Sequence, residues 1–157
     1  MNGIVNKRRV VLTLGEAYKF LNQGIEPTYN DYLNKQVINE IKYYLKKNKV
    51  YPKVYISYSR KAFFANHDRN FRLTFDSQII TRREDLALES GSFGQDILGE
   101  GRYLMEVKIL GAMPLWFTKI LAELKIYNTH FSKYGNEFMN YCLNNSNIDI
   151  KGREKAC

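Results

Sequence analysis

The sequence has few of the residues from which disulfide frameworks and soft metal centres are built. Its two cysteines, Cys142 and Cys157, are too few and too badly placed for a disulfide framework, which indicates a reducing compartment. Neither cysteine has a second cysteine or a histidine at metal-ligand spacing, and the two histidines, His67 and His130, are isolated. A metal centre built from thiolates or imidazoles is therefore not expected.

Long apolar runs are also missing. No stretch approaches the ~18 consecutive apolar residues that a membrane-spanning helix needs, and the chain does not open with a signal peptide. We therefore expect a cytoplasmic protein with no membrane span in this chain.

What the chain does have is positive charge and aromatic side chains. Its 157 residues include 24 Lys and Arg against 16 Asp and Glu, for a formal charge of +8, and 12 Tyr and 9 Phe. The length predicts one domain. The charge indicates an anionic partner, which the composition leaves open between nucleic acid, phosphate chains and an acidic membrane surface.

The most informative stretch is residues 103–109, a short β-type run with glycines on both sides. Alternation places Glu106 and Lys108 on the polar face of this strand, about 7 Å apart along it. Such a pair is suited to binding a metal and an anion. It is also typical of an ordinary solvated strand face, and on this pair alone the solvated face is favoured.

Three other segments show a similar pattern. The predicted strands are residues 4–12 with Lys7 and Arg9, residues 54–62 with Tyr58 and Arg60, and residues 70–76 with Arg72, Thr74 and Asp76 opposite an apolar face. If these strands pair, their cations converge, and two cations ~8 Å apart repel by roughly 2 kcal/mol at an effective dielectric of ~20. The pattern therefore indicates either charges that spread into water or a site that holds a polyanion.

The remaining elements are mostly helices. Thr13 and Glu16 predict a capping box for a short helix that ends near Gly24, and apolar spacing predicts a second helix over residues 27–49. We further expect a hairpin of residues 71–76 and 79–83 across Ser77–Gln78, an irregular connection over 84–101 with one short strand, a helix from Pro114, a turn at 131–135, a helix over 136–144 and a polar tail over 145–157. The fold class is therefore α+β, with a mostly antiparallel sheet and flanking helices.

Five motifs, in order, resemble the vacuolar transporter chaperone (VTC) domain of polyphosphate polymerases, in the triphosphate tunnel metalloenzyme superfamily. They are Gly3-Ile4-Val5 with Lys7-Arg8-Arg9, Tyr58-Ser59-Arg60-Lys61-Ala62-Phe63, Phe71-Arg72-Leu73-Thr74-Phe75-Asp76, Met105-Glu106-Val107-Lys108 and Ser132-Lys133-Tyr134. Each motif alone is weak, but their order and spacing make a specific signal over residues 3–144. We therefore expect a VTC-like domain over residues 1–144.

The resemblance implies part of an antiparallel β-barrel, a tunnel lined by basic residues with an acidic residue for a divalent metal, Mn²⁺ or Mg²⁺. The residues that match tunnel positions are Lys7, Arg9, Arg60, Arg72, Arg82, Lys108 and Lys133 for phosphate binding, Arg72, Glu106 and Lys108 for catalysis, and Glu106 for the metal. Arginine forks and a hard carboxylate oxygen suit this chemistry. The implied partners are ATP and polyphosphate or pyrophosphate.

The resemblance covers only the C-terminal part of such a domain. We expect the intact domain to build polyphosphate from ATP by metal-dependent phosphoryl transfer. The alternative for this chain is a non-catalytic polyphosphate- or phosphate-binding module, because the strands of the N-terminal half have no counterpart here. An incomplete sheet also predicts self-association through an open edge. Nucleic-acid binding ranks behind both, since Phe71, Leu73 and Phe75 lie opposite Arg72 and suit a core better than a base-stacking platform.

Overall fold

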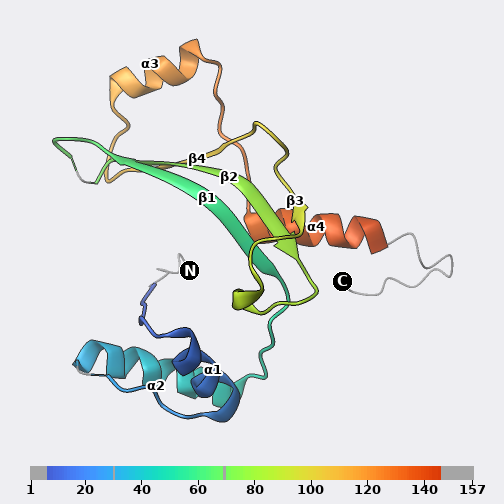
Figure 1. The fold of residues 1–157 in the computed structure, drawn as a ribbon. Coiled ribbons are helices and arrows are strands. Elements are labelled where there is room, and N and C mark those ends of the chain that lie inside the picture. The colour runs from blue at the N-terminus through green and yellow to red at the C-terminus, as the bar shows by residue number, and fades with distance from the viewer. Residues whose placement is uncertain (1–6, 30, 69, 146–157) are drawn as a thin grey trace. The chain divides into compact units, whose positions relative to one another are not determined.

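The computed structural model describes residues 7–29, 31–68 and 70–145. The chain divides into two compact units, with the division between Tyr51 and Pro52. The first unit is helical, and the second contains an antiparallel sheet with further helices, so the predicted α+β class is confirmed (Figure 1).

The first unit contains helices α1 (Leu14–Gln23) and α2 (Tyr32–Lys47). The predicted capping box at Thr13 is present, and Gly24 ends α1 in the left-handed conformation at φ 71°. Asp31 caps α2, and Lys46 and Lys47 lie in its last turn, where cations complement the helix dipole.

The predicted opening strand is wrong for its described part. Residues 7–12 are irregular, and residues 4–6 lie outside the described residues. No strand among the described residues pairs with this segment, so its backbone has no ladder partner. Arg8 instead contacts Glu40 of α2 at 2.5 Å. The self-association predicted at the edge of this strand therefore loses its basis in residues 7–12.

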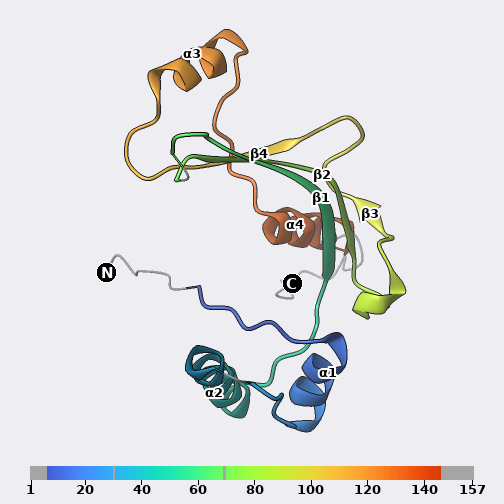
Figure 2. The same cartoon turned by 60° about the vertical axis from the view of Figure 1, so that its left-hand side comes forward.

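The sheet of the second unit is built around β2 (Arg72–Arg82). β1 (Tyr55–Phe64) pairs with one side of β2 along its length, and the other side pairs first with β4 (Leu104–Lys108) and then with β3 (Gln95–Asp96). All pairs are antiparallel. In the described part of the chain the sheet is strongly curved but does not close into a barrel (Figure 2).

β2 is a single strand, and the hairpin predicted across Ser77–Gln78 is wrong. Ser57 pairs with Ile80 but Ser59 pairs with Ser77, so β2 carries one extra residue opposite Tyr58. Gln78 adopts φ 52° at this bulge. The polar Ser-Gln pair therefore marks an interruption in the ladder and not a chain reversal.

The extra residue shifts the phase of β2. Before the bulge, Asp76 lies on the same face as Thr74, and after it the same face continues through Ile79, Thr81 and Arg83. Thr74, Asp76, Ile79 and Thr81 are all buried. This face is therefore continuous along the whole strand, although its residues change from even to odd numbers.

The connection after β2 contains a short 3-10 helix, η1 (Leu88–Ser90), which was not predicted, and then β3, which is the short strand that was predicted. It crosses β2 closely at Gly94, where an added Cβ atom would lie 2.3 Å from the carbonyl oxygen of Thr81. Gly94 also adopts φ 138°, so a larger residue here would meet both a clash and an unfavourable backbone conformation.

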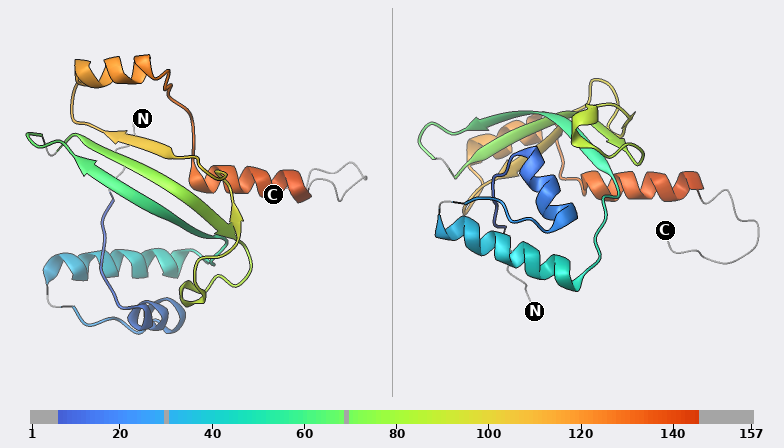
Figure 3. Two further views of the ribbon diagram at one scale, coloured as in Figure 1. Left: turned by 45° about the horizontal axis from the view of Figure 1, so that its top comes forward. Right: turned by 60° about the horizontal axis from the view of Figure 1, so that its bottom comes forward.

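Two helices, α3 and α4, follow the sheet in the chain and lie apart from each other (Figure 3). α3 (Leu115–Glu123) begins after Pro114, near the end of the sheet at which β1 leads into β2. There Phe71 packs edge-to-face on Trp116 and Phe117. α4 (Lys133–Asn145) lies against the concave face of the β1–β2 pair (Figure 2).

α4 begins earlier than predicted, and the turn expected at 131–135 is wrong in its second half. The Ser132 hydroxyl accepts a hydrogen bond from the backbone N–H of Gly135, and the Ser132 carbonyl accepts one from Asn136. These bonds satisfy groups of the first helical turn in spite of its glycine. Lys133 is consequently a helix residue with a mostly buried side chain.

Candidate functional site

The register of β1, β2 and β4 places three cross-strand rows on the concave face. The rows are Arg60–Asp76–Leu104, Ala62–Thr74–Glu106 and Phe64–Arg72–Lys108. Because side chains alternate between faces, residues one position along each strand lie on the opposite face. Arg60, Arg72, Glu106 and Lys108 are thus brought together on one face, as the alternation predicted.

Asp76 lies at the centre of the charge network on this face. Its side chain is 1% exposed, and Arg60 donates to both of its oxygens at 2.6 and 2.7 Å. The ammonium of Lys133 lies 2.6 Å from Oδ2. A buried carboxylate on β2 therefore holds one cation from β1 and one from α4.

The protonation of this cluster follows from its geometry. Burial raises the pKa of Asp76, but the hydrogen bonds from Arg60 and Lys133 and their charges together outweigh burial, so the pKa is lowered. The hydrogen bond to Asp76 raises the pKa of Arg60 in turn. Asp76 and Arg60 are therefore both charged at neutral pH.

Tyr58 forms an aromatic wall of the same cluster. Its ring centroid lies 4.4 Å from the Lys133 ammonium and 5.0 Å from the Arg60 guanidinium carbon. Both distances are within the range of cation–π attraction. The ring limits where the two cations can move, and their side chains are 28% (Arg60) and 20% (Lys133) exposed.

Glu106 is the second carboxylate of the face and is much more accessible. It lies 3.1 Å from the Lys108 ammonium and 3.6 Å from Arg60, and its side chain is 42% exposed. Four cations (Arg60, Arg72, Lys108 and Lys133) and two carboxylates leave this part of the face with a net charge of +2. Its charge balance favours an anionic ligand.

Arg72 is the cation of this face with an unsatisfied donor. Its Nε atom is buried and has no hydrogen-bond partner in the structure, and its guanidinium carbon lies 5.4 Å from the Phe64 ring centroid. An unpaired buried donor of a charged group is unfavourable. An anion that accepted a hydrogen bond there would remove this cost.

A second buried ion pair fixes α4 on the sheet. Arg83 donates to both oxygens of Glu137 at 2.7 and 2.9 Å, and its guanidinium carbon lies 3.6 Å from the Tyr141 ring centroid. Glu137 lies one helical turn after Lys133, so both side chains point from the same side of α4. The Arg83–Glu137 pair therefore helps to place Lys133 at Asp76.

Arg82, predicted to add to the phosphate-binding wall, has a different environment. Its guanidinium is stacked between Tyr55 and Phe93, with ring centroids 3.6 and 4.2 Å away. It donates four hydrogen bonds to carbonyls of the connection after β2, those of Asp85, Ala87, Gly91 and Phe93. These contacts hold the connection, and Arg82 is left out of the proposed phosphate site.

Lys7 and Arg9 belong to the first unit. Both are exposed and lie in the irregular segment before α1. Their part in phosphate binding stays a prediction.

The sequence alone gave little weight to several residues of the network. Asp76 and Tyr58 were predicted only as secondary wall residues beside the cations, and Arg83 and Glu137 were not identified. A carboxylate among the apolar residues of a β-type run was the available signal for Asp76. Arg83 and Glu137 had no such signal, because their meeting depends on the bulge at Gln78.

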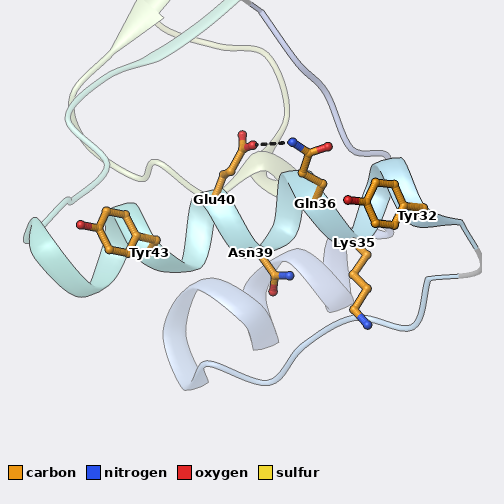
Figure 4. A pocket seen from close by; sticks show the side chains of 6 residues that line it. All are labelled: Tyr32, Lys35, Gln36, Asn39, Glu40 and Tyr43. Atoms are coloured by element: carbon orange, nitrogen blue, oxygen red, sulfur yellow. Dashed lines mark hydrogen bonds between the residues drawn. The ribbon is translucent and has the colours of Figure 1, made fainter.

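The first unit carries a shallow hollow of its own. It is lined by Tyr32, Lys35, Gln36, Asn39, Glu40 and Tyr43, all from α2 (Figure 4). Gln36 donates a hydrogen bond to Glu40 across it. One helix provides every lining residue, and none of the predicted site residues is among them. We therefore regard this hollow as a depression on the surface of α2 and not as a candidate site.

Residues 1–140 match the family model of the VTC domain. The chain belongs to the VTC domain family. Comparison with curated proteins and with solved structures gives no match. Membership indicates a function related to polyphosphate and, in general, dependence on a metal. None of the helices in the described part of this VTC domain has the length and apolarity required to cross a membrane.

Proposed function

We propose that the concave face of β1, β2 and β4 binds the phosphate chain of polyphosphate and of ATP. In the intact domain this face supports metal-dependent phosphoryl transfer that builds polyphosphate from ATP. The observation that carries the proposal is the placement of Arg60, Arg72 and Lys108 on the face that also holds Glu106, with Lys133 brought to it by α4. Guanidinium forks match phosphate oxygens in geometry as well as in charge.

The cations of the face have distinct roles in the proposal. Arg60 and Lys133 are held in place by Asp76, so little reorganisation is needed when a phosphate chain binds beside them. Arg72 has a free Nε donor, and the Lys108 side chain is mostly exposed. Arg72 and Lys108 would therefore contact the transferred phosphate group and neutralise the charge on its oxygens.

Glu106 is the described carboxylate that fits a divalent metal. The described residues contain no group of three or more acidic, histidine or cysteine side chains that could hold a metal, and Asp76 is only 1% exposed beneath Arg60 and Lys133. Mg²⁺ and Mn²⁺ are commonly held by one or two carboxylates together with phosphate oxygens and water, which an accessible Glu106 satisfies. A metal held by Glu106 would supply positive charge that offsets the charge developing on the phosphate during transfer.

The alternative is a polyphosphate-binding module without turnover. It is favoured by the open sheet, because within the described residues the four strands do not close into a barrel. Binding needs the cations of one face, whereas phosphoryl transfer also needs the donor and acceptor to be held in line. The two functions therefore share the same residues and differ in whether ATP is consumed.

Two measurements on the same protein separate these functions. Calorimetry with inorganic tripolyphosphate measures binding, and incubation with ATP and Mn²⁺ measures polyphosphate formation. Binding together with polyphosphate formation supports the polymerase, and binding without ATP consumption supports the module. Absence of tripolyphosphate binding would reject both, and competition by single-stranded oligonucleotides would indicate a nucleic-acid site instead.

Arg72→Ala tests the site itself. Loss of a charge-assisted hydrogen bond should weaken tripolyphosphate binding about tenfold or more. Arg102→Ala is the matched control, because Arg102 is an exposed arginine of the turn before β4 and lies outside the three rows. Equal affinities of the two variants would count against the assignment of Arg72.

A further inference from the structure

A groove of about 600 Å³ runs along β4 on the side away from β2. One wall is β4 with the residue before it, and the other comes from Met113, α3, the connection to α4 and the first residue of α4. Its lining consists of Tyr103, Leu104, Met105, Glu106, Val107, Met113, Leu121, Ile126, Tyr127, Asn128, Thr129, Phe131 and Lys133.

Two residues of the proposed phosphate site line this groove. Glu106 is the candidate metal ligand, and Lys133 is the cation held by Asp76. A ligand with phosphates on the concave face could therefore extend into the groove without leaving Glu106 or Lys133. The groove and the phosphate site are parts of one continuous surface.

The rest of the groove does not suit a phosphate chain. Most of its lining is apolar or aromatic, and Tyr127 and Tyr103 expose 77% and 62% of their surface. An inorganic phosphate chain has no apolar surface to cover these rings. A nucleobase has a flat apolar face that stacks on tyrosine, and polar edges that the neighbouring Asn128 and Thr129 can meet.

We infer that this groove is the nucleoside subsite of a nucleoside triphosphate whose phosphates occupy the concave face. The inference rests on the proposed function and adds to it a location for the base and residues that select a nucleotide over an inorganic phosphate chain. The volume is within the range of small-molecule sites. Tyr127 is the residue that we expect to stack on the base.

Another occupant of such a groove would be a β-strand from a second copy of the chain. In the described part of the molecule β4 pairs with β2 alone, so its outer edge has free backbone groups. A strand, however, would have no need of a carboxylate and an ammonium in the same groove. The presence of Glu106 and Lys133 there favours the nucleotide.

The experiment compares ATP with inorganic tripolyphosphate, which has the same number of phosphates and no base. Calorimetry on the full chain measures both affinities for the parent, for Tyr127→Ala and for Tyr32→Ala. Tyr32 is the matched control, because it is 78% exposed and lies on α2. Both tyrosines are too exposed for their loss to threaten the fold.

We expect Tyr127→Ala to weaken ATP binding about fivefold to tenfold through the loss of stacking, with tripolyphosphate affinity unchanged. Tyr32→Ala should change neither. Tripolyphosphate binding together with an equal effect of Tyr127→Ala on both ligands, or no effect on either, would overturn the nucleoside subsite and leave the phosphate site standing. A dimer that Tyr127→Ala dissociates, with both affinities unchanged, would also overturn it and assign the groove to strand pairing.

Discussion

The ammonium of Lys133 lies 2.6 Å from Oδ2 of Asp76, and this contact joins the first turn of α4 to the middle of β2. Arg60 occupies the same carboxylate from β1. One buried charge therefore orients two cations from different elements toward the same face. The network places two of the proposed phosphate-binding groups and also contributes to the stability of the fold.

Asp76→Asn should destabilise the protein. The substitution keeps the shape of the side chain but leaves Arg60 and Lys133 without their common counter-charge, and we expect a loss of about 2–4 kcal/mol in the free energy of unfolding. Urea denaturation measures it. Glu106→Gln is the control, because Glu106 is accessible and its ion pairs are worth at most about 1 kcal/mol. Equal losses for the two variants would contradict the central place of Asp76.

The same carboxylate should make stability depend on pH in the acid range. Because the folded pKa of Asp76 is lowered, its contribution is fully present above the ordinary aspartate value of 3.8 and is lost as the pH falls through the folded pKa. Below 3.8 the unfolded chain takes up this proton first, which favours unfolding. Unfolding free energies measured from pH ~6 to pH ~2 should converge for parent and Asp76→Asn at the acid end. A constant difference between them would contradict the lowered pKa.

Lys108 and Lys61 form a matched pair for testing which face binds phosphate. Both are exposed lysines of strands that pair with β2, but Lys108 lies in the row of Arg72, whereas Lys61 pairs with Phe75 on the opposite face. Lys108→Ala should weaken tripolyphosphate binding about threefold to tenfold, and less at high salt because the attraction is screened. Lys61→Ala should have no effect in the same calorimetric titration. A larger effect of Lys61→Ala would move the site to the other face.

Deletion of Gln78 should be far more harmful than its substitution. Removing the extra residue restores a regular ladder and turns Ile79, Thr81 and Arg83 to the wrong face, so we expect no cooperative unfolding transition by circular dichroism. Gln78→Gly keeps the bulge and suits φ 52°, so its stability should stay within about 1 kcal/mol of the parent. A deletion variant with the parent's denaturation midpoint would show that the bulge does not set the face.

Arg82→Lys tests whether Arg82 stabilises the fold or binds phosphate. A lysine cannot replace the flat guanidinium between Tyr55 and Phe93 or its fork of donors, and we expect a loss of about 2–4 kcal/mol in unfolding free energy. Tripolyphosphate affinity of the folded variant should remain within about twofold of the parent, because Arg82 lies apart from the site. Weakened binding by a stable variant would return Arg82 to the phosphate-binding wall.

Local patterns in the sequence were sufficient for much of the fold. The capping box of Thr13 and Glu16, the helix after Pro114 and the strands around Arg60, Arg72 and Glu106 depend on neighbours within a few residues. Alternation within each strand also fixed which side chains share its polar face. The predictions at Gln78 and Ser132 were wrong. The position of a β-bulge and the first residue of a helix depend on the element that packs against them as well as on the local residues.

The sequence by itself determined most of the helices and strands and the basic character of their polar faces, since these follow from the spacing of apolar and charged residues along the chain. Only the tertiary structure decided which charges meet. Asp76 binds Lys133, and Arg83 binds Glu137, because the extra residue of β2 keeps one face continuous and α4 lies across it. Side chains so distant in sequence have no short-range signal in common, and the packing of α4 on the sheet fixes their distance.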